Sequence, residues 1–308
     1  NKKVNKSRKL IKMDIFKSLT FGVKFTKPHL KKAMPAVKME IKKEVEEDFI
    51  PLKRKKMSEE FKKCKENEVI NKIQKEHCIK VKGIDEKEKP IESFDELFTR
   101  FKIHAKLMKN VICLNYSQPT AVQMQCIPLF LKQKELKVAA PTGSGKTLAF
   151  VFPLIQNILS MSEREDIQAV IIVPTRELAT QILSVTTRLC VDTGVRAHII
   201  TNTNEEKMKK FHKKKTDILI STPMKLNHFI ANSSMSLKNV QWIVIDEVDK
   251  LFEESNQKFQ DDLDVILEAC DNPKRKFALF SATTSKTMTS WVHENLKNFA
   301  TINISPNM

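Results

Sequence analysis

The residues with the clearest chemical potential form a glycine-rich stretch that follows the apolar run 136–140 and precedes a helical pattern. Gly143 and Gly145 tolerate positive φ and let backbone N–H groups approach a polyphosphate closely. Lys146 supplies a cation for the outer phosphates and Thr147 a hydroxyl for Mg²⁺. We therefore predict a nucleotide phosphate site whose residues are Ala140, Pro141, Thr142, Gly143, Ser144, Gly145, Lys146 and Thr147. Ala140 stands where this pattern usually begins with glycine.

A second candidate is an acidic pair directly after the apolar run 241–245. Hydrolysis of a Mg²⁺-bound nucleotide needs one carboxylate for the metal and another that orients or deprotonates the attacking water. We assign Asp246 to the first role and Glu247 to the second. The candidate catalytic residues are then Lys146, Asp246 and Glu247, and the candidate Mg²⁺ ligands are Thr147 and Asp246. A helix N-terminus that carries acids for dipole reasons is the alternative.

Three other apolar runs are followed by small hydroxyl residues. Taken singly, these are ordinary helix N-caps. Taken together, they line one rim with hydroxyls, backbone amides and two cations, which suits a sugar-phosphate backbone contacted without base readout. The residues after these runs are Pro174, Thr175, Arg176 and Glu177; Thr222, Pro223 and Lys225; and Ser281, Ala282 and Thr283.

The elements that must position these residues alternate along the chain. Helical patterns cover 146–160, 176–190, 204–212, 223–232, 256–270 and 284–297, and the strand-like runs between them are 136–140, 168–173, 195–200, 217–221, 241–245, 276–281 and 300–304. Such alternation predicts an α/β fold with a parallel sheet and helices on both faces. Ligands bind such sheets at the carboxyl ends of the strands.

The chain has 308 residues and a net charge of +17. Residues 1–90 carry 27 Lys/Arg against 14 Asp/Glu, and residues 91–308 carry 27 against 23. We interpret 1–90 as a basic, largely disordered or partly helical extension, with helical character at 58–77. Its charge favours nucleic acid as a partner, and a solvated arm is the alternative. Residues 51–56 would serve as a nuclear-import signal or be a solvated charge run.

Several classes of protein are disfavoured by composition. The six cysteines form no C-x-x-C pair, which argues against a structural zinc site or disulfide framework and fits a reducing compartment. The chain shows no apolar stretch near the ~18 residues that span a bilayer and no signal peptide, so we expect no membrane association.

Together these motifs resemble the first RecA-like domain of DEAD-box ATP-dependent RNA helicases, from about Ser93 to the C-terminus. The resemblance implies a RecA-like P-loop fold over 91–308, an ATPase core at 127–308, ATP and Mg²⁺ as cofactors, and RNA as partner. It also implies a Q motif at 115–123, within a region 91–126, in which Gln123 reads adenine. An upstream aromatic ring would stack on the base. We choose Phe94, and Phe98 is the competitor.

The same resemblance implies the remaining roles. Residues 174–177, Thr222, Pro223 and Lys225 would grip RNA phosphates. Asp249, Ser281, Ala282 and Thr283 would couple the ATP site to RNA, with Ser281 and Thr283 bonding the acidic motif.

A narrower similarity rests on residues 101–104, the pair at 124–125 and residues 249–253, which are similar to nucleolar helicases of small-subunit ribosomal RNA processing. It implies pre-ribosomal RNA as substrate, ribosome-assembly proteins as further partners, a nuclear and nucleolar location, and a monomer.

Some positions depart from the family pattern. Val248 replaces alanine, Lys225 replaces arginine and loses bidentate phosphate geometry, 115–116 replace Gly-Phe, and a Gly-Gly pair is missing around 201–204. The second RecA-like domain, with its catalytic arginines, is absent from this sequence. Because such an arginine is worth on the order of 10³–10⁵ in turnover, we expect the chain alone to be nearly inactive.

Two other functions are the alternatives. One is a non-enzymatic RNA or ribonucleoprotein binding module, and the other is a different P-loop ATPase, such as a DNA translocase.

Overall fold

The computed structural model describes residues 59–164, 167–200, 215–232, 236–252 and 257–305. The first 58 residues, the import-signal candidate at 51–56, the helix expected at 204–212 and the region 201–204 lie outside the described residues. Residues 56–308 form one compact unit.

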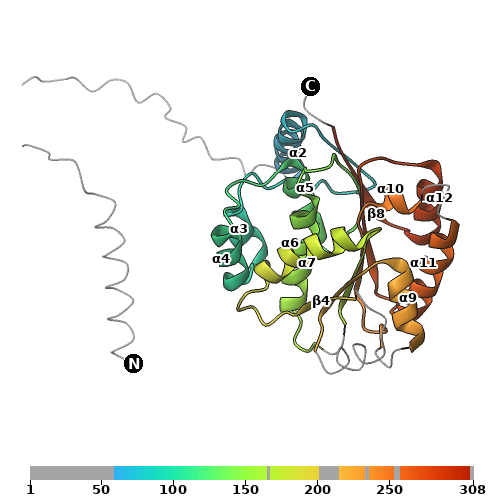
Figure 1. Ribbon diagram of the computed structural model, residues 1–308. Helices are drawn as coiled ribbons and strands as arrows, with labels where there is room; N and C mark the ends of the chain where they lie inside the picture. Colours follow the sequence, from blue (N-terminus) through green and yellow to red (C-terminus); the bar gives the residue numbers. More distant parts are fainter. Residues whose placement is uncertain (1–58, 165–166, 201–214, 233–235, 253–256, 306–308) are drawn as a thin grey trace, which may run out of the picture. The chain divides into compact units, whose positions relative to one another are not determined.

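The centre of this unit is an eight-stranded sheet in the order β1-β8-β2-β7-β6-β3-β5-β4. Every strand pair is parallel except β1 with β8, which is antiparallel. The α/β fold with a mainly parallel sheet is therefore confirmed (Figure 1). The strands are β1 (Ile79–Lys82), β2 (Glu135–Ala139), β3 (Ala169–Ile172), β4 (Ala197–Ile199), β5 (Ile218–Ser221), β6 (Trp242–Ile245), β7 (Lys276–Ser281) and β8 (Phe299–Ile304).

Helices cover both faces of the sheet, as predicted (Figure 1). One layer and its flank contain α2 (Glu59–Glu76), α3 (Glu96–Phe101), α4 (Ala105–Cys113), α5 (Ala121–Leu131), α6 (Lys146–Leu159) and α7 (Arg176–Leu189). The other contains α9 (Pro223–Asn232), α10 (Val248–Leu251), α11 (Gln257–Ala269) and α12 (Lys286–Asn295). Among these described helices, none combines the length and apolar character needed to cross a bilayer.

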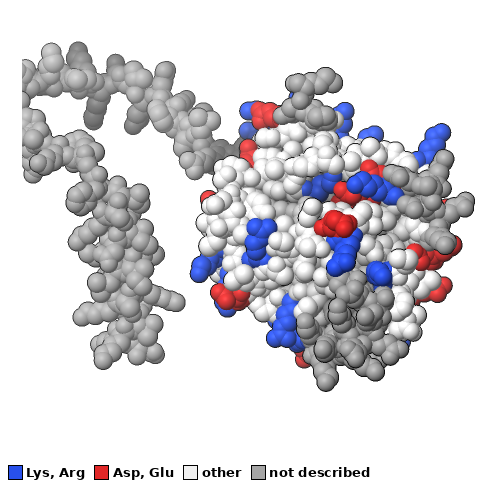
Figure 2. Space-filling view, viewed as in Figure 1, with Lys and Arg blue, Asp and Glu red and all other residues white. Residues whose placement is uncertain are grey.

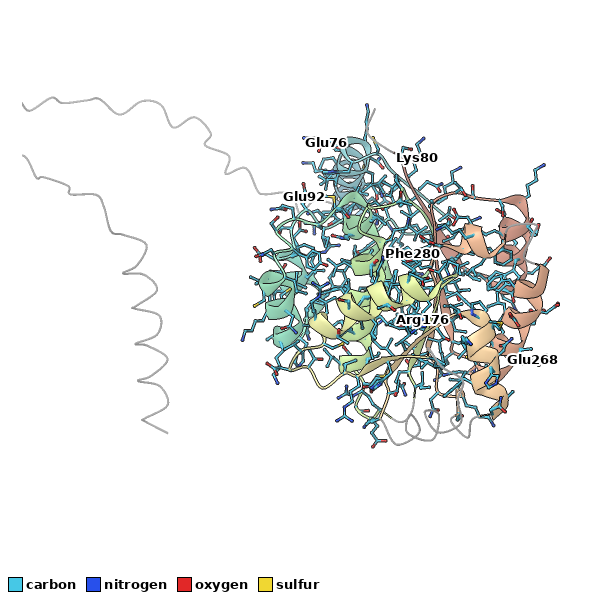
Figure 3. All side chains as sticks on the ribbon, viewed as in Figure 1. Glu76, Lys80, Glu92, Arg176, Glu268 and Phe280 are labelled. Atoms are coloured by element: carbon cyan, nitrogen blue, oxygen red, sulfur yellow. The ribbon has the colours of Figure 1, made fainter. Side chains whose placement is uncertain are left out.

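The apolar strand runs reflect burial on both sides of the sheet. In β6, Trp242 and Val244 belong to the core under α5 and α6, while Ile243 and Ile245 belong to the core under α9 and α11. Successive side chains of a strand point to opposite faces, so a sheet covered twice needs apolar residues at every position. The ring centroid of Phe280 in β7 lies 5.0 Å from that of Phe150 in α6. Figure 3 labels Phe280 among the side chains of the sheet and its helices.

Residues 59–90 contribute more to the fold than a basic extension was expected to. The helix predicted near 58–77 is α2, whose Ile70 and Ile73 are buried. The strand β1 was not predicted, and it pairs with β8 in register from Ile79 opposite Ile304. A boundary at residue 91 therefore leaves out a strand of the sheet. The physical reason is that a four-residue edge strand with two lysines carries almost no apolar signal.

Candidate active site

Apart from Phe94 and Gln123, the candidate residues share the carboxyl edge of the sheet because they follow parallel strands. The glycine-rich loop follows β2, Ser281 ends β7, and Asp246 follows β6, and these three strands are neighbours. The next strands along, β3 and β5, are followed by Thr175 and Thr222. The phosphate and metal candidates therefore lie at the ends of three adjacent strands, and the RNA candidates lie at the ends of the two strands beside them.

The phosphate-loop residues form a tight turn into α6. Gly143 and Gly145 have φ of 75° and 89°, in the region that favours glycine. Lys146 is the first residue of α6, and its Nζ donates to the carbonyl oxygens of Ala140 at 2.8 Å and Pro141 at 3.2 Å. The hydroxyl of Ser144 is buried and has no hydrogen-bond partner. In this loop, the ammonium group of Lys146 is therefore held by two carbonyl oxygens that phosphate oxygens could replace. The hydroxyl of Ser144 is a second donor, and it has no acceptor.

Gln123 joins the Q-motif region to this loop. Its Nε2 donates to the carbonyl of Gly145 at 3.0 Å, and its Oε1 accepts from the backbone N–H of Thr120 at 3.1 Å. A Cβ at position 145 would lie 2.4 Å from that Nε2. Residue 145 must therefore be glycine both for its φ and for the close approach of Gln123.

The two candidate stacking residues differ in their surroundings. Phe94 is 5% exposed and lines a cavity of ≈ 380 Å³ together with Met108, Tyr116 and Gln118. Phe98 is 45% exposed and does not line this cavity. The cavity has apolar and aromatic walls beside the Q-motif residues, so the geometry favours Phe94.

Asp246 is a deeply buried carboxylate, with 3% of its surface exposed. Its Oδ1 accepts from the backbone N–H of Glu247 at 2.9 Å. Burial raises the pKa of Asp246 to about 6, while this hydrogen bond and the charge of Lys146 lower the pKa in part, and the charges of Glu247 and Asp249 raise it. Because Lys146 acts on Asp246 electrostatically, the cation of the loop and the first acid of the motif belong to one site.

Glu247 adopts a conformation unusual for a residue with a side chain. Its φ and ψ are 52° and 46°, in the left-handed region, which costs roughly 1–2 kcal/mol for a non-glycine residue. Its Oε2 is paired with Nζ of Lys250 at 2.7 Å, one turn along. Such strain is typical of functional positions, and Glu247 follows β6 directly after Asp246.

Thr283 makes the predicted link to the acidic motif. Its backbone N–H and its hydroxyl both donate to Oδ2 of Asp249, at 2.9 Å and 2.8 Å. Ser281 does not make the expected bond, because its buried hydroxyl contacts the carbonyl of Val138 in β2 at 3.4 Å. As the last residue of β7, Ser281 faces the neighbouring strand, and its own carbonyl accepts from the N–H of Ala140 at 3.0 Å. Ala282, between them, is exposed.

The rim residues are arranged at two helix starts. Thr175 caps α7 by accepting from the N–H of Leu178 at 3.2 Å, so its hydroxyl already has a structural role. Thr175, Arg176 and Glu177 are exposed, whereas Pro174, Thr222 and Lys225 are partly buried and Pro223 is buried. On the face in Figure 2, basic and acidic side chains are scattered rather than gathered in one basic patch. Arg176, one of the two cations among the rim residues, is labelled in Figure 3.

Comparison with known proteins decides the family. The model of the DEAD/DEAH box helicase family matches residues 120–291, which include the phosphate loop, the acidic motif and both rim segments. This chain belongs to the DEAD/DEAH box helicase family.

Individual relatives of this member of the DEAD/DEAH box family agree with that assignment. It is 38% identical over 242 residues to "Probable ATP-dependent RNA helicase DDX52" of Mus musculus, covering 77% of the chain and 40% of the relative. It is 36% identical over 202 residues to "ATP-dependent RNA helicase ROK1" of Vanderwaltozyma polyspora, covering 63% of the chain and 35% of the relative. A crystal structure of a DEAD box protein from Methanococcus jannaschii superposes with a TM-score of 0.62 at 29% identity, covering 70% of this chain and 57% of that one.

The sequence patterns assigned no individual role to two residues of the DEAD-box site. Lys250 pairs with Glu247, and Tyr116 forms a wall of the cavity at Phe94. The i, i+3 spacing of opposite charges in a helical segment is a signal for the first. Nothing in the sequence alone indicates which side of the Q-motif segment Tyr116 occupies.

Proposed function

We propose that this chain is the nucleotide- and RNA-binding catalytic part of an ATP-dependent RNA helicase. Mg-ATP would bind at the ends of β2, β7 and β6, and the RNA backbone at the ends of β3 and β5. The observation that carries the proposal is that Lys146, in the loop after β2, and the buried Asp246, directly after β6, lie at one edge of the sheet on strands separated only by β7. A cation for phosphate and a carboxylate for a metal are brought together by residues 100 positions apart.

The residues present fit Mg-ATP. The loop offers the unpartnered hydroxyl of Ser144, and the Nζ of Lys146 can exchange its two carbonyl contacts for phosphate oxygens. Among the described residues, none other than the two chain neighbours of Gly143 comes within 4 Å of a Cβ built on it, so the loop tip is open on that side. Thr147 and Asp246 would hold Mg²⁺, which when bound neutralises charge on the outer phosphates.

Glu247 would act on the attacking water. Glu247 directly follows Asp246 at the end of β6, its backbone N–H donates to Oδ1 of Asp246, and a carboxylate at this position can orient a water molecule and accept its proton. The bond from Thr283 to Asp249 joins the end of β7 to the same motif. That bond is a physical link through which a change at the acidic motif would reach the segment that follows β7.

The adenine base would enter the cavity at Phe94. Phe94, Met108 and Tyr116 give it apolar and aromatic walls, and a flat base is held well by such surfaces. Gln123 would read the base edge while it remains fixed to the phosphate loop through Gly145. Its amide makes two hydrogen bonds within the protein, so base recognition would use the remaining capacity of its oxygen or a rearranged bond.

The RNA substrate would be pre-ribosomal, and the location nucleolar. This finer assignment is supported by the similarity to DDX52 and ROK1 and by the sequence features at 101–104, 124–125 and 249–253. Arg176 and Lys225 would contact phosphates without reading sequence. Because the chain spans 40% of the mouse relative, we expect hydrolysis by residues 1–308 alone to be slow without the arginines that the family resemblance assigns to a second domain.

Isothermal titration of the chain with Mg-ATP tests the site. Lys146→Ala should abolish binding because it removes the cation for the phosphates, whereas Glu247→Gln should preserve binding and remove residual hydrolysis measured at excess protein. Equal ATP affinity in the Lys146→Ala chain would overturn the phosphate-loop assignment.

A further inference from the structure

The helix α5, which carries Gln123, is held from its other side by residues 59–91. Gln125 is fully buried, with 0% of its surface exposed, and both polar atoms of its amide are used. Its Oε1 accepts from Nε2 of Gln74 in α2 at 2.8 Å, and its Nε2 donates to the carbonyl of Glu88 at 3.1 Å. A buried amide satisfied by two separate segments fixes the helix that carries it.

A proline in α5 creates a second attachment next to the first. Pro128 has no N–H, so the carbonyl of Met124 lacks its normal partner four residues along the helix. The N–H of Ile91 fills that position at 2.9 Å. Residues 124 and 125 of one helix are therefore both bonded to the same incoming segment.

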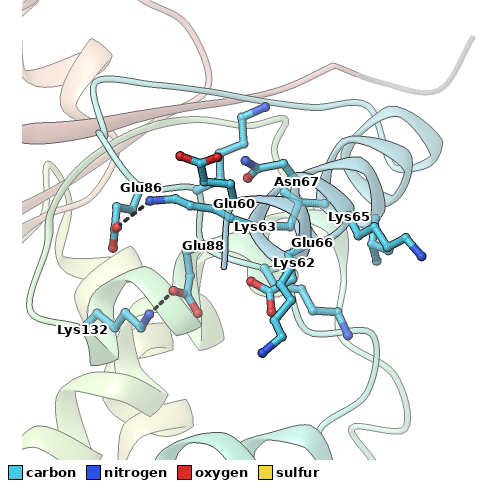
Figure 4. Close-up of a pocket in the computed structure, with 13 residues that line it drawn as sticks. Glu60, Lys62, Lys63, Lys65, Glu66, Asn67, Glu86, Glu88 and Lys132 are labelled. Carbon is cyan, nitrogen blue, oxygen red and sulfur yellow. Dashed lines mark hydrogen bonds and ion pairs between the residues drawn. The ribbon is translucent and has the colours of Figure 1, made fainter. Parts of the chain in front are cut away.

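The segment itself is anchored through Glu88. The carboxylate of Glu88 is paired with Arg100 at 2.6 Å and with Lys132 at the end of α5. Figure 4 shows Lys132 and Glu88 on one side of a cavity of ≈ 860 Å³, and the Lys63–Glu86 pair between α2 and the segment. The attachment of α5 thus rests on ionic and backbone contacts together.

Gln123 lies two residues before Gln125, on the side of α5 that faces the phosphate loop. A rotation of α5 by about 20° would move an atom about 6 Å from the helix axis by about 2 Å. That displacement is enough to break the 3.0 Å bond from Gln123 to Gly145. The orientation of α5 therefore decides where the amide of Gln123 stands.

We propose that Gln125 is a positioning residue for adenine recognition, and that it acts by holding α5 through Gln74 and Glu88. This inference rests on the proposed function, in which Gln123 reads the base. It assigns to α2 and the segment 86–91, which lie outside the matched family region, a part in nucleotide selection.

The test is the ratio of the Kd for Mg-GTP to the Kd for Mg-ATP, measured by titration calorimetry on the full chain. Gln125→Met keeps the size and helix preference but removes both hydrogen bonds, and we expect the ratio to fall three- to tenfold, the worth of one well-placed hydrogen bond. Affinity for tripolyphosphate should stay within about twofold, because the phosphate loop is unchanged. A purely structural role would weaken ATP, GTP and tripolyphosphate alike.

Three further variants make the result decisive. Gln74→Met removes the bond from the α2 side and should lower the ratio in the same direction, even if Gln125→Met does not fold. Asn71→Ala is the matched control and should keep the ratio, since the bond that it removes ties α2 to Lys87 of the segment and not to a residue of α5. A normal ratio in Gln74→Met and Gln125→Met, or an equal loss of tripolyphosphate affinity, would overturn the proposal. Gln123→Ala separates the two levels: if it keeps the ratio, adenine reading by Gln123 is itself wrong.

Discussion

Asp246→Asn should stabilise the nucleotide-free protein. Asp246 is buried, and its pKa is raised from 3.8 to about 6, so the folded state carries a charged carboxylate at an unfavourable site above pH 6. At 1.36 kcal/mol per pKa unit, the difference corresponds to about 3 kcal/mol. Asparagine keeps the oxygen that accepts from the N–H of Glu247 and removes the charge. The free energy that the variant recovers is the cost of keeping a metal-binding carboxylate charged and buried in the folded state.

The stabilisation should depend on pH in a defined direction. Because the folded-state pKa is the higher one, the penalty is absent below pH ~4, grows between pH 4 and 6, and is complete above pH 6. Urea unfolding should therefore show a gain for Asp246→Asn of about 3 kcal/mol at pH 8 and a clearly smaller gain at pH 5, where the folded-state carboxyl is largely protonated. Asp261→Asn, at an exposed position of α11, is the control and should change stability by less than about 0.5 kcal/mol. A variant that is less stable than the parent, or a gain independent of pH, would refute the reasoning.

Three other outcomes follow from the candidate nucleotide and RNA sites. Since the pKa of Asp246 is raised to about 6, the affinity for Mg-ATP measured by calorimetry should fall about tenfold from pH 7 to pH 5 in the parent chain and less in Asp246→Asn. An equal dependence of affinity on pH in the two proteins would contradict the assignment of Asp246 to the metal. A double-mutant cycle of Thr283→Val and Asp249→Ala in urea unfolding should give an interaction of about 1 kcal/mol, and additive effects would show that their bond contributes nothing. In fluorescence anisotropy with oligouridylate, Lys225→Met should reduce the salt slope by about 0.7 and Met224→Gln should leave it unchanged; an unaltered slope for Lys225→Met would assign RNA binding elsewhere in the chain.

The parts of the site that sequence could predict are those where chemistry restricts residue type. Phosphate binding restricts positions 143, 145 and 146, and metal-dependent hydrolysis restricts 246 and 247, so these residues could be identified without a structure. The strands under them were equally predictable. A strand such as β6 is buried on both faces, and its unbroken apolar run is typical of the interior of a sheet that helices cover on both sides.

The remainder depends on contacts between distant segments. β1 alternates apolar residues with lysines and gains its place only by pairing with β8, more than 200 positions away. The roles of Gln125 and Ser281 depend on which neighbour each side chain meets, the amide of Gln74 in one case and the carbonyl of Val138 in the other. Side-chain type alone does not specify such partners, and the expected bond of Ser281 was wrong for that reason.

A crystal structure of the chain with Mg²⁺ and a non-hydrolysable ATP analogue is the most direct test of a single nucleotide site. We predict that Nζ of Lys146 leaves the carbonyls of Ala140 and Pro141 for the outer phosphates, with the metal on the Asp246 side of the same triphosphate. A nucleotide bound away from this edge, with Lys146 still on those carbonyls, would contradict the account.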